Sequence, residues 1–141
     1  MLPDLVAADV QLLEQPFRIG SESDMDGLHC PIPVAADESV QTIEDLPRLV
    51  GRFDVINIKL DKCGGLTHAL RMAQEARRLG FRLMVGNMIG TSWAMASAFI
   101  VGQACEIVDL DGPLLLAADR QPAVRYRDGN IECPDEVWGA P

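Results

Sequence analysis

The chain has 141 residues, about the size of one domain, and 48% of them are hydrophobic whereas only 5% are aromatic, which indicates an aliphatic core. Its net charge of −9 argues against nucleic acid or an anionic membrane surface as a partner, because both are bound through clustered Lys and Arg. The sequence has no apolar run of membrane-spanning length, no secretion signal at its start and no C-x-x-C pair among its four cysteines, so we expect a soluble, cytoplasmic protein.

Two short strands are predicted near the start of the chain. After the tail of a helix at residues 5–8, residues 10–13 form a strand that ends in Glu14-Gln15-Pro16, where the proline stops it. Residues 20–30 are rich in Ser, Asp and Glu and are expected to form a surface connection with solvated charges. Residues 33–36 form a second strand, which ends in Asp37-Glu38-Ser39. Each of the two strands therefore ends in a carboxylate.

The middle of the chain is predicted to form a helix, a strand and a second helix. Residues 42–50 carry an apolar helical stripe, with Thr42 as the N-cap. Residues 55–60 form an apolar run rich in β-branched side chains, typical of a parallel strand that is buried on both faces. A Gly-Gly pair then permits a sharp turn with positive φ, and residues 66–78 show apolar side chains at helical spacing.

Lys59 is the anomalous residue of the third strand. A lysine is rarely buried unless it is paired or functional, and burial lowers its pKa toward the range of a general base or a Schiff-base lysine. The alternative is that Lys59 lies at the rim of the sheet and pairs with a carboxylate such as Asp61. The residues by themselves leave both interpretations open.

A fourth strand, at residues 81–85, leads into a loop punctuated by glycines at residues 86–92 and then a helix at residues 93–101. The N–H groups at the start of this helix could hold a carboxylate, although an ordinary loop and N-cap explain the pattern equally well. The fifth strand follows.

That fifth strand, at residues 106–110, carries Asp109 and Asp111 two positions apart, which places both side chains on one face of a strand. Beyond it, only a weak hairpin signal is present, at residues 127–130.

The predicted strands end at polar residues that recur along the chain with spacings of 23, 22, 28 and 22: Glu14, Asp37, Lys59, Asn87 and Asp109. Regular alternation of strand and helix predicts a parallel sheet. Polar groups at the carboxyl end of every strand favour part of a (β/α)₈ barrel over a doubly wound sheet. A full barrel needs roughly 250 residues, so this chain supplies about half of one.

The first three strand ends predict a specific chemistry. Two carboxylates on adjacent strands suit Mg²⁺, which usually takes one or two carboxylates together with water and substrate oxygens. A lysine on the next strand would be placed to take a proton from the carbon beside a carboxylate that the ion binds. The ion would stabilise the enolate as its charge develops.

These motifs resemble those of the enolase superfamily, in its muconate-lactonizing branch. Glu14-Gln15-Pro16, Asp37-Glu38-Ser39 and residues 57–65 are similar to the signatures of its fourth, fifth and sixth strands. Residues 86–92 and 109–113 are similar to the seventh and eighth strand motifs of dipeptide epimerases of the L-Ala-D/L-Glu type. The resemblance covers nearly the whole chain. It implies one partial domain, residues 1–141, holding about strands 4 to 8 of a TIM-type barrel, with the N-terminal capping domain and the first barrel strands absent.

The resemblance also implies roles for the residues that match its motifs. Lys59 becomes one of two acid/base lysines, and Glu14 and Asp37 become ligands of Mg²⁺. Asp109 and Asp111 bind the α-ammonium of a dipeptide substrate, which agrees with the attraction of paired carboxylates for a cation. The remaining assignments are Asn87 and Met88 in the substrate-binding loop, and Lys62 as a supporting or surface charge.

Other functions compete with this interpretation. An o-succinylbenzoate synthase or a cycloisomerase of the same branch needs no clamp for an ammonium group, so the Asp109/Asp111 pair is the feature that discriminates. The implied second lysine and first metal-ligand aspartate are missing, which favours a half-barrel that is non-catalytic or active only after self-association or pairing with an N-terminal half. A Schiff-base aldolase that uses Lys59 is a more distant alternative. An open five-stranded sheet has two unpaired edges, so we expect the isolated chain to be associated or poorly stable.

Overall fold

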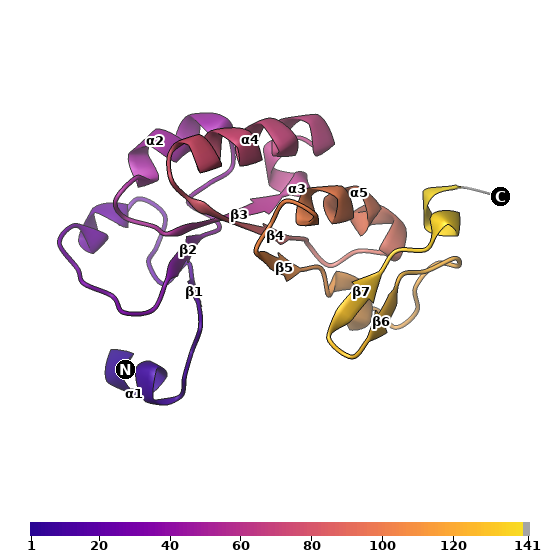
Figure 1. Cartoon of the computed structure of the whole chain (residues 1–141), viewed down its shortest axis with the longest axis horizontal. Helices are drawn as coiled ribbons and strands as arrows, with labels where there is room; N and C mark the ends of the chain where they lie inside the picture. Colours follow the sequence, from indigo (N-terminus) through magenta and orange to yellow (C-terminus); the bar gives the residue numbers. More distant parts are fainter. Residues whose placement is uncertain (140–141) are drawn as a thin grey trace.

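A computed structural model describes residues 1–139 as a parallel sheet with helices packed on one face, followed by a small hairpin (Figure 1). The last two residues of the predicted domain, 140–141, lie outside the described residues. All five predicted strands are present, as β1 (Leu13–Glu14), β2 (Val34–Ala36), β3 (Val55–Lys59), β4 (Arg82–Gly86) and β5 (Ile107–Asp109). They lie side by side in the order of the sequence, and every neighbouring pair is parallel. The predicted α/β half-barrel is confirmed.

Helices connect the strands and complete the chain. Those between the five strands of the parallel sheet are η1 (Glu22–Met25), η2 (Ile43–Asp45), α2 (Leu46–Leu49), α3 (Leu60–Cys63), α4 (Leu66–Arg78) and α5 (Ser92–Gly102). The others are α1 (Leu2–Ala7), η3 (Gly112–Leu115) and η4 (Asp135–Trp138), and the weak hairpin signal is confirmed as β6 (Arg125–Arg127) and β7 (Asn130–Glu132). Within residues 1–139, none of the helices has the length and apolarity needed to cross a membrane.

The two faces of the sheet bury very different amounts of apolar surface. Between the sheet and the helices lies the main core, which includes Ile56 and Ile58 of β3 and Ala69, Met72 and Ala76 of α4. The opposite face holds only a small cluster: Ala35, Val55 and Met84, with Leu12 and Ile107 beside it. Because side chains alternate along a strand, Asn57 and Lys59 lie on the same sparsely packed face as Val55. That alternation sends the polar residues of β3 away from the main core.

Local signals in the sequence explain where the helices begin. Thr42 and Asp45 form a reciprocal capping box at the start of η2, as the N-cap pattern predicted. The Gly64-Gly65 pair has φ values of +89° and +96°, which glycine adopts without steric cost, and α4 begins directly after it. Thr91 caps α5 by accepting a hydrogen bond from the backbone N–H of Ala94. The short helix α3 was not predicted, and it places Lys62 one turn after Lys59.

The expectation that residues 20–30 carry only solvated charges is wrong for one residue. Glu22, in η1, is 5% exposed and forms an ion pair with Arg48. No local pattern indicates this burial, because the partners of Glu22 lie 17 and 26 residues away along the chain.

Candidate functional site

The carboxyl ends of β1, β2 and β3 bring Glu14, Asp37 and Lys59 together. The register pairs Glu14 with Ala35 and Ala36 with Ile56, so the three strands end at nearly the same level of the sheet. Nζ of Lys59 lies 2.8 Å from Oδ2 of Asp37 and 3.9 Å from Oε1 of Glu14. Three of the residues predicted from strand ends therefore form one cluster.

Asp37 is the centre of this cluster. It is 7% exposed, and Lys59 and Lys62 donate to its two carboxylate oxygens. Lys62 also donates to the backbone carbonyl of Asp37, at 2.6 Å. Burial opposes ionisation, but the hydrogen bonds from the two ammonium groups outweigh it and hold the pKa of Asp37 below its ordinary value. Lys59 and Lys62 are the only two lysines in the sequence, so both of them contact one carboxylate.

The expectation that burial lowers the pKa of Lys59 is wrong for this arrangement. Burial does oppose the charge, yet the hydrogen bond to Asp37 and its negative charge raise the pKa of Lys59. The partner is Asp37 and not the neighbouring Asp61 of the alternative interpretation. Lys59 is thus an ammonium group as the structure stands, in position to donate a proton.

Glu14 is held by Asn57, a residue to which the sequence analysis gave no role. Nδ2 of Asn57 donates to Oε1 of Glu14 at 2.6 Å, and Asn57 is itself 1% exposed. Gly86, on the neighbouring strand, makes room for this contact, because a Cβ atom there would lie 2.8 Å from Oδ1 of Asn57 and 2.9 Å from Cε of Lys59. Strand alternation was the signal available in the sequence, since Asn57 and Lys59 are two residues apart and share a face.

Glu14, Asp37 and Lys59 line an open depression of about 710 Å³, together with Gln15 and Phe17 among others. Within residues 1–139, no group of three or more His, Cys, Asp or Glu side chains is arranged to hold a metal ion. The two carboxylates nevertheless suit Mg²⁺, because this ion commonly takes one or two protein carboxylates and fills its other positions with water and substrate oxygens. The donor set of the depression therefore fits the predicted cofactor.

Asp109 and Asp111 lie at and just beyond the end of β5. The expectation that one strand face carries both is only partly right, because β5 ends at Asp109 and Asp111 is the N-cap of η3. Partial burial, followed by the charge of Asp111, raises the pKa of Asp109. None of the ion pairs within residues 1–139 involves either carboxylate. The register aligns Lys59 with Gly86 and Gly86 with Asp109, so Lys59 and Asp109 stand two strands apart at one level.

Asn87 and Met88 follow β4 directly. Because β4 lies between β3 and β5 in the sheet, these two residues come between Lys59 and the Asp109/Asp111 pair. Met88 is 56% exposed, whereas Asn87 packs against Gly112 so closely that a Cβ atom on Gly112 would lie 2.4 Å from Nδ2 of Asn87. The loop after β4 is therefore seated on the start of η3 and presents Met88 outward.

Comparisons with known proteins agree with this fold. Residues 1–137 match the family model described as Enolase C-terminal domain-like. The chain is 47% identical over 136 residues to an N-acetyl-D-glutamate racemase from Pseudoalteromonas, covering 96% of this chain and 43% of that protein. It is 43% identical over 122 residues to the L-Ala-D/L-Glu epimerase of Escherichia coli K12, covering 86% of this chain and 38% of that one.

Solved structures give the same result. A crystal structure of an enolase family member from Agrobacterium tumefaciens with homology to dipeptide epimerases, which contains bound sodium and L-Ala-L-Glu, superposes with a TM-score of 0.91 at 48% identity and covers 98% of this chain and 43% of that one. A dipeptide epimerase from Methylococcus capsulatus complexed with Mg superposes with a TM-score of 0.83 at 32% identity, covering 92% of this chain and 40% of that one. The chain thus spans roughly two fifths of the length of the relatives it matches.

Proposed function

Because the chain belongs to the enolase superfamily, we propose that it forms the proton-transfer part of an active site that epimerises dipeptides of the L-Ala-D/L-Glu type. The observation that carries the proposal is the meeting of Lys59 with the carboxylates of Glu14 and Asp37 at three neighbouring strand ends. Epimerisation removes a proton from the α carbon and returns one to the opposite face, so it needs an acid/base group beside that carbon.

Lys59 is the acid/base group in this proposal. After its ammonium group, hydrogen-bonded to Asp37, gives up a proton to solvent, Nζ would take the α proton of a substrate lying over the depression and then return a proton to the resulting carbanion from the same face. Glu14 and Asp37 would hold Mg²⁺, an ion that the structure of the Methylococcus capsulatus relative contains. When bound, Mg²⁺ supplies positive charge that stabilises the negative charge developing on the substrate carboxylate.

Asp109 and Asp111 would bind the α-ammonium of the dipeptide. Two neighbouring carboxylates attract a cation; the pKa of Asp109 is raised first by burial and then by the charge of Asp111, and a bound ammonium group would offset that second effect. Asn87 and Met88 would line the space between the ammonium site and Lys59. With these assignments, the site would contact the substrate from the reacting carbon to its amino end.

A second candidate function follows from the N-acetyl-D-glutamate racemase at 47% identity. Its substrate, like L-Ala-L-Glu, is a glutamate with an acylated nitrogen, but an acetyl group offers no ammonium to Asp109 and Asp111. The two candidate functions therefore differ in one requirement: only the dipeptide epimerase needs a substrate with a free amino group. An o-succinylbenzoate synthase or a cycloisomerase likewise has no use for an ammonium clamp.

We also propose that a complete site requires a further chain segment or a second copy. In the sheet order, β1 and β5 each have one strand neighbour, and the face that carries Lys59 has only a small apolar cluster. A half-barrel of this kind is either active after assembly with a partner segment or inactive. Measuring activity with and without such a segment separates these two possibilities.

The test follows the glutamate α proton of L-Ala-L-Glu by NMR in D₂O with Mg²⁺. The chain is used alone and mixed with the portion of the Escherichia coli relative that lies outside the matched region. Because Lys59 can exchange the α proton for deuterium from one face of the carbon, we expect the α-proton signal to disappear in the mixture, where the site is complete. Free N-acetyl-D-glutamate is the parallel substrate, and faster exchange with it would favour the second candidate.

Lys59→Arg is the matched variant for this test. Arginine preserves the positive charge beside Asp37 but is never deprotonated in proteins, so α-proton exchange should stop while the fold is retained. A folded chain that exchanges neither substrate, alone or in the mixture, would contradict the proposed function. So would unchanged exchange in the Lys59→Arg variant.

A further inference from the structure

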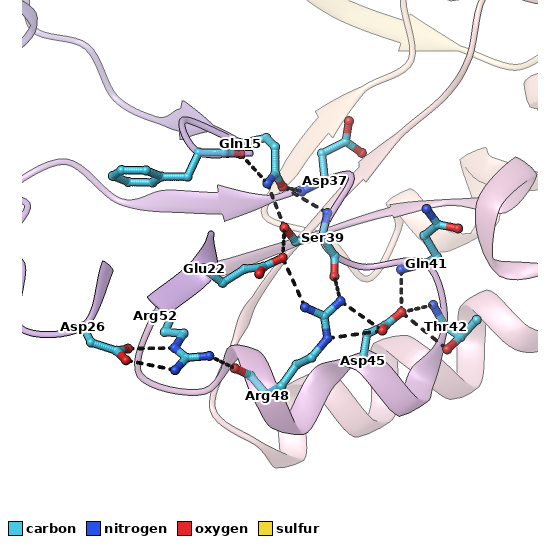
Figure 2. Close-up of polar contacts among 11 residues, drawn as sticks. Gln15, Glu22, Asp26, Asp37, Ser39, Gln41, Thr42, Asp45, Arg48 and Arg52 are labelled. Atoms are coloured by element: carbon cyan, nitrogen blue, oxygen red, sulfur yellow. Dashed lines mark hydrogen bonds and ion pairs between the residues drawn. The ribbon is translucent and has the colours of Figure 1, made fainter. Parts of the chain in front are cut away.

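A partly buried polar network joins the end of β1 to the end of β2, directly beside the two carboxylates (Figure 2). Its first member is Gln15, which follows Glu14 in the chain. Oε1 of Gln15 accepts hydrogen bonds from the backbone N–H groups of Asp37, at 2.9 Å, and Ser39, at 3.2 Å. Nε2 donates to Oγ of Ser39 at 2.8 Å and to the backbone carbonyl of Phe17 at 2.9 Å. One side chain thus uses its full capacity of two acceptor and two donor positions.

The network continues from Ser39 to an internal ion pair. Ser39 is fully buried, and its hydroxyl donates to Oε1 of Glu22 at 2.7 Å. Arg48 contacts the same carboxylate at 3.1 Å and donates to the backbone carbonyl of Ser39 at 2.6 Å. The hydrogen bond from Ser39 is the main reason that the pKa of Glu22 falls to about 2. Glu22 is therefore an ionised carboxylate at neutral pH, although it is only 5% exposed.

The backbone of Gln15 departs from ordinary strand geometry. Its φ angle is +41°, a left-handed conformation that residues other than glycine seldom adopt. Its N–H group still donates to the carbonyl of Ala35 at 2.9 Å, so the backbone remains attached to β2. Such conformations persist only where the surroundings determine them, and they are concentrated at functional sites. In Figure 2, the side chain of Gln15 extends from this turn toward Asp37 and Ser39.

We propose that Gln15, with Ser39, Glu22 and Arg48 behind it, is a positioning residue that fixes the separation of the Glu14 and Asp37 carboxylates for a small divalent cation. The inference rests on the proposed function, which assigns those carboxylates to Mg²⁺. Gln15 is covalently linked to the residue that carries one of them and hydrogen-bonded to the backbone N–H of the residue that carries the other, so it connects the two strand ends. Neither Gln15 nor Ser39 touches the substrate in this proposal.

A positioning role makes a prediction that a purely structural role does not. Mg²⁺ demands near-ideal octahedral geometry at 2.0–2.1 Å, whereas Ca²⁺ accepts flexible geometry at about 2.3–2.6 Å. A loosened separation between Glu14 and Asp37 should therefore weaken Mg²⁺ binding more than Ca²⁺ binding. General destabilisation of the fold would weaken both ions equally.

The test measures the affinities of the whole chain for Mg²⁺ and for Ca²⁺ by calorimetric titration. Gln15→Leu removes the amide, and Ser39→Ala removes only the hydroxyl, which keeps the test valid if the larger change prevents folding. We expect Gln15→Leu to raise the Kd for Mg²⁺ about tenfold, with a clearly smaller rise for Ca²⁺. Gln11→Leu is the control, because among residues 1–139 the side-chain amide of Gln11 donates hydrogen bonds only to Asp9, at the exposed start of the same segment.

Amide hydrogen exchange in the metal-free chain gives an independent readout. In Gln15→Leu, the N–H groups of Asp37 and Ser39 lose their acceptor and should exchange at least about tenfold faster. The N–H of Leu13, which donates to Pro33, should keep its rate. Unchanged exchange at Asp37 and Ser39, or an equal loss of affinity for both ions, overturns the inference. If the unmodified chain binds neither ion and exchange still accelerates, the metal assignment fails while the link from Gln15 to Asp37 stands.

Discussion

The side-chain amide of Asn57 donates a hydrogen bond of 2.6 Å to Oε1 of Glu14, so a fully buried residue fixes a carboxylate that faces solvent. We expect Asn57→Leu to weaken Mg²⁺ binding about tenfold by releasing Glu14. The unfolding free energy should change by no more than about 1 kcal/mol, because Oδ1 of Asn57 is buried without a hydrogen-bond partner among the described residues and leucine removes it as well. Calorimetric titration and urea unfolding measure the two quantities. Unchanged affinity in the folded variant would show that Glu14 needs no support.

Gly86→Ala, on β4, should displace Asn57 and Lys59 on the neighbouring strand β3 and so lower the rate of α-proton exchange. The added methyl group would lie 2.8 Å from Oδ1 of Asn57 and 2.9 Å from Cε of Lys59, and such overpacking typically costs about 1–3 kcal/mol. Because Lys59 must move, we expect α-proton exchange to fall at least about a hundredfold. Gly102→Ala is the control, since a methyl group there meets Val85 at an ordinary 3.4 Å. Equal exchange rates in the two variants would contradict the proposed place of Lys59.

Glu22 should make the stability of the chain sensitive to acid. Its pKa is lowered from 4.5 to about 2 in the folded chain, so its contribution is complete above the ordinary value and disappears as the pH falls toward 2. The loss should be on the order of 2 kcal/mol, measured by urea unfolding between pH 5 and pH 2. Glu22→Gln should be less stable at pH 7 and should show a flatter dependence over this interval.

The exposed pair of Asp26 and Arg52 provides the comparison for Glu22. It joins the same two segments as Glu22 and Arg48, yet it makes no contact with Ser39 (Figure 2). Asp26→Asn should leave most of the dependence on pH intact. An equal flattening in the Asp26 and Glu22 variants would mean that the acid sensitivity arises elsewhere.

Asp109→Asn and Asp111→Asn should weaken the binding of substrates that have a free amino group. We expect the KM for L-Ala-L-Glu to rise about tenfold or more, with no change for an N-acetylated substrate, because only the former carries an ammonium group. Steady-state kinetics of the assembled protein measure both values. Asp128→Asn is a suitable control, since Asp128 lies in the hairpin turn at φ +50°, a conformation that asparagine tolerates. A parallel rise for both substrates would argue against the clamp.

The edges of the sheet should govern the solution behaviour of the chain. β1 and β5 each have one strand neighbour, and Val108 on β5 is 45% exposed. Unpaired strand edges promote association, so sedimentation should detect species larger than one chain, or calorimetry should detect a weak, poorly cooperative transition. A monodisperse monomer that melts cooperatively would contradict this expectation.

Patterns that extend over a few residues predicted most of the fold. All five strands, the capping box at Thr42 and the glycine turn before α4 depend on short-range periodicity and backbone freedom, which the sequence displays directly. Glu14, Asp37 and Lys59 were predicted to meet because the carboxyl ends of parallel strands share one edge. The structure brings them together.

The contacts that the sequence analysis missed all depend on distant partners. Glu22 was expected to be solvated, but it is buried by Ser39 and Arg48, which lie on other elements. The raised pKa of Lys59 could not be predicted from burial alone, because its direction depends on where Asp37 points. Lys62 contacts Asp37 only because the unpredicted helix α3 turns it back toward β2.

The pairing of both lysines with Asp37 gives the chain a built-in chemical reporter. Apart from the amino terminus, Lys59 and Lys62 hold the only primary amines in the sequence, and their side chains are 15% and 16% exposed. A reagent that acylates amines must compete with one carboxylate for both of them. The extent of acylation at these two positions, read by mass spectrometry, therefore follows whatever occupies Asp37, without any dye or isotope.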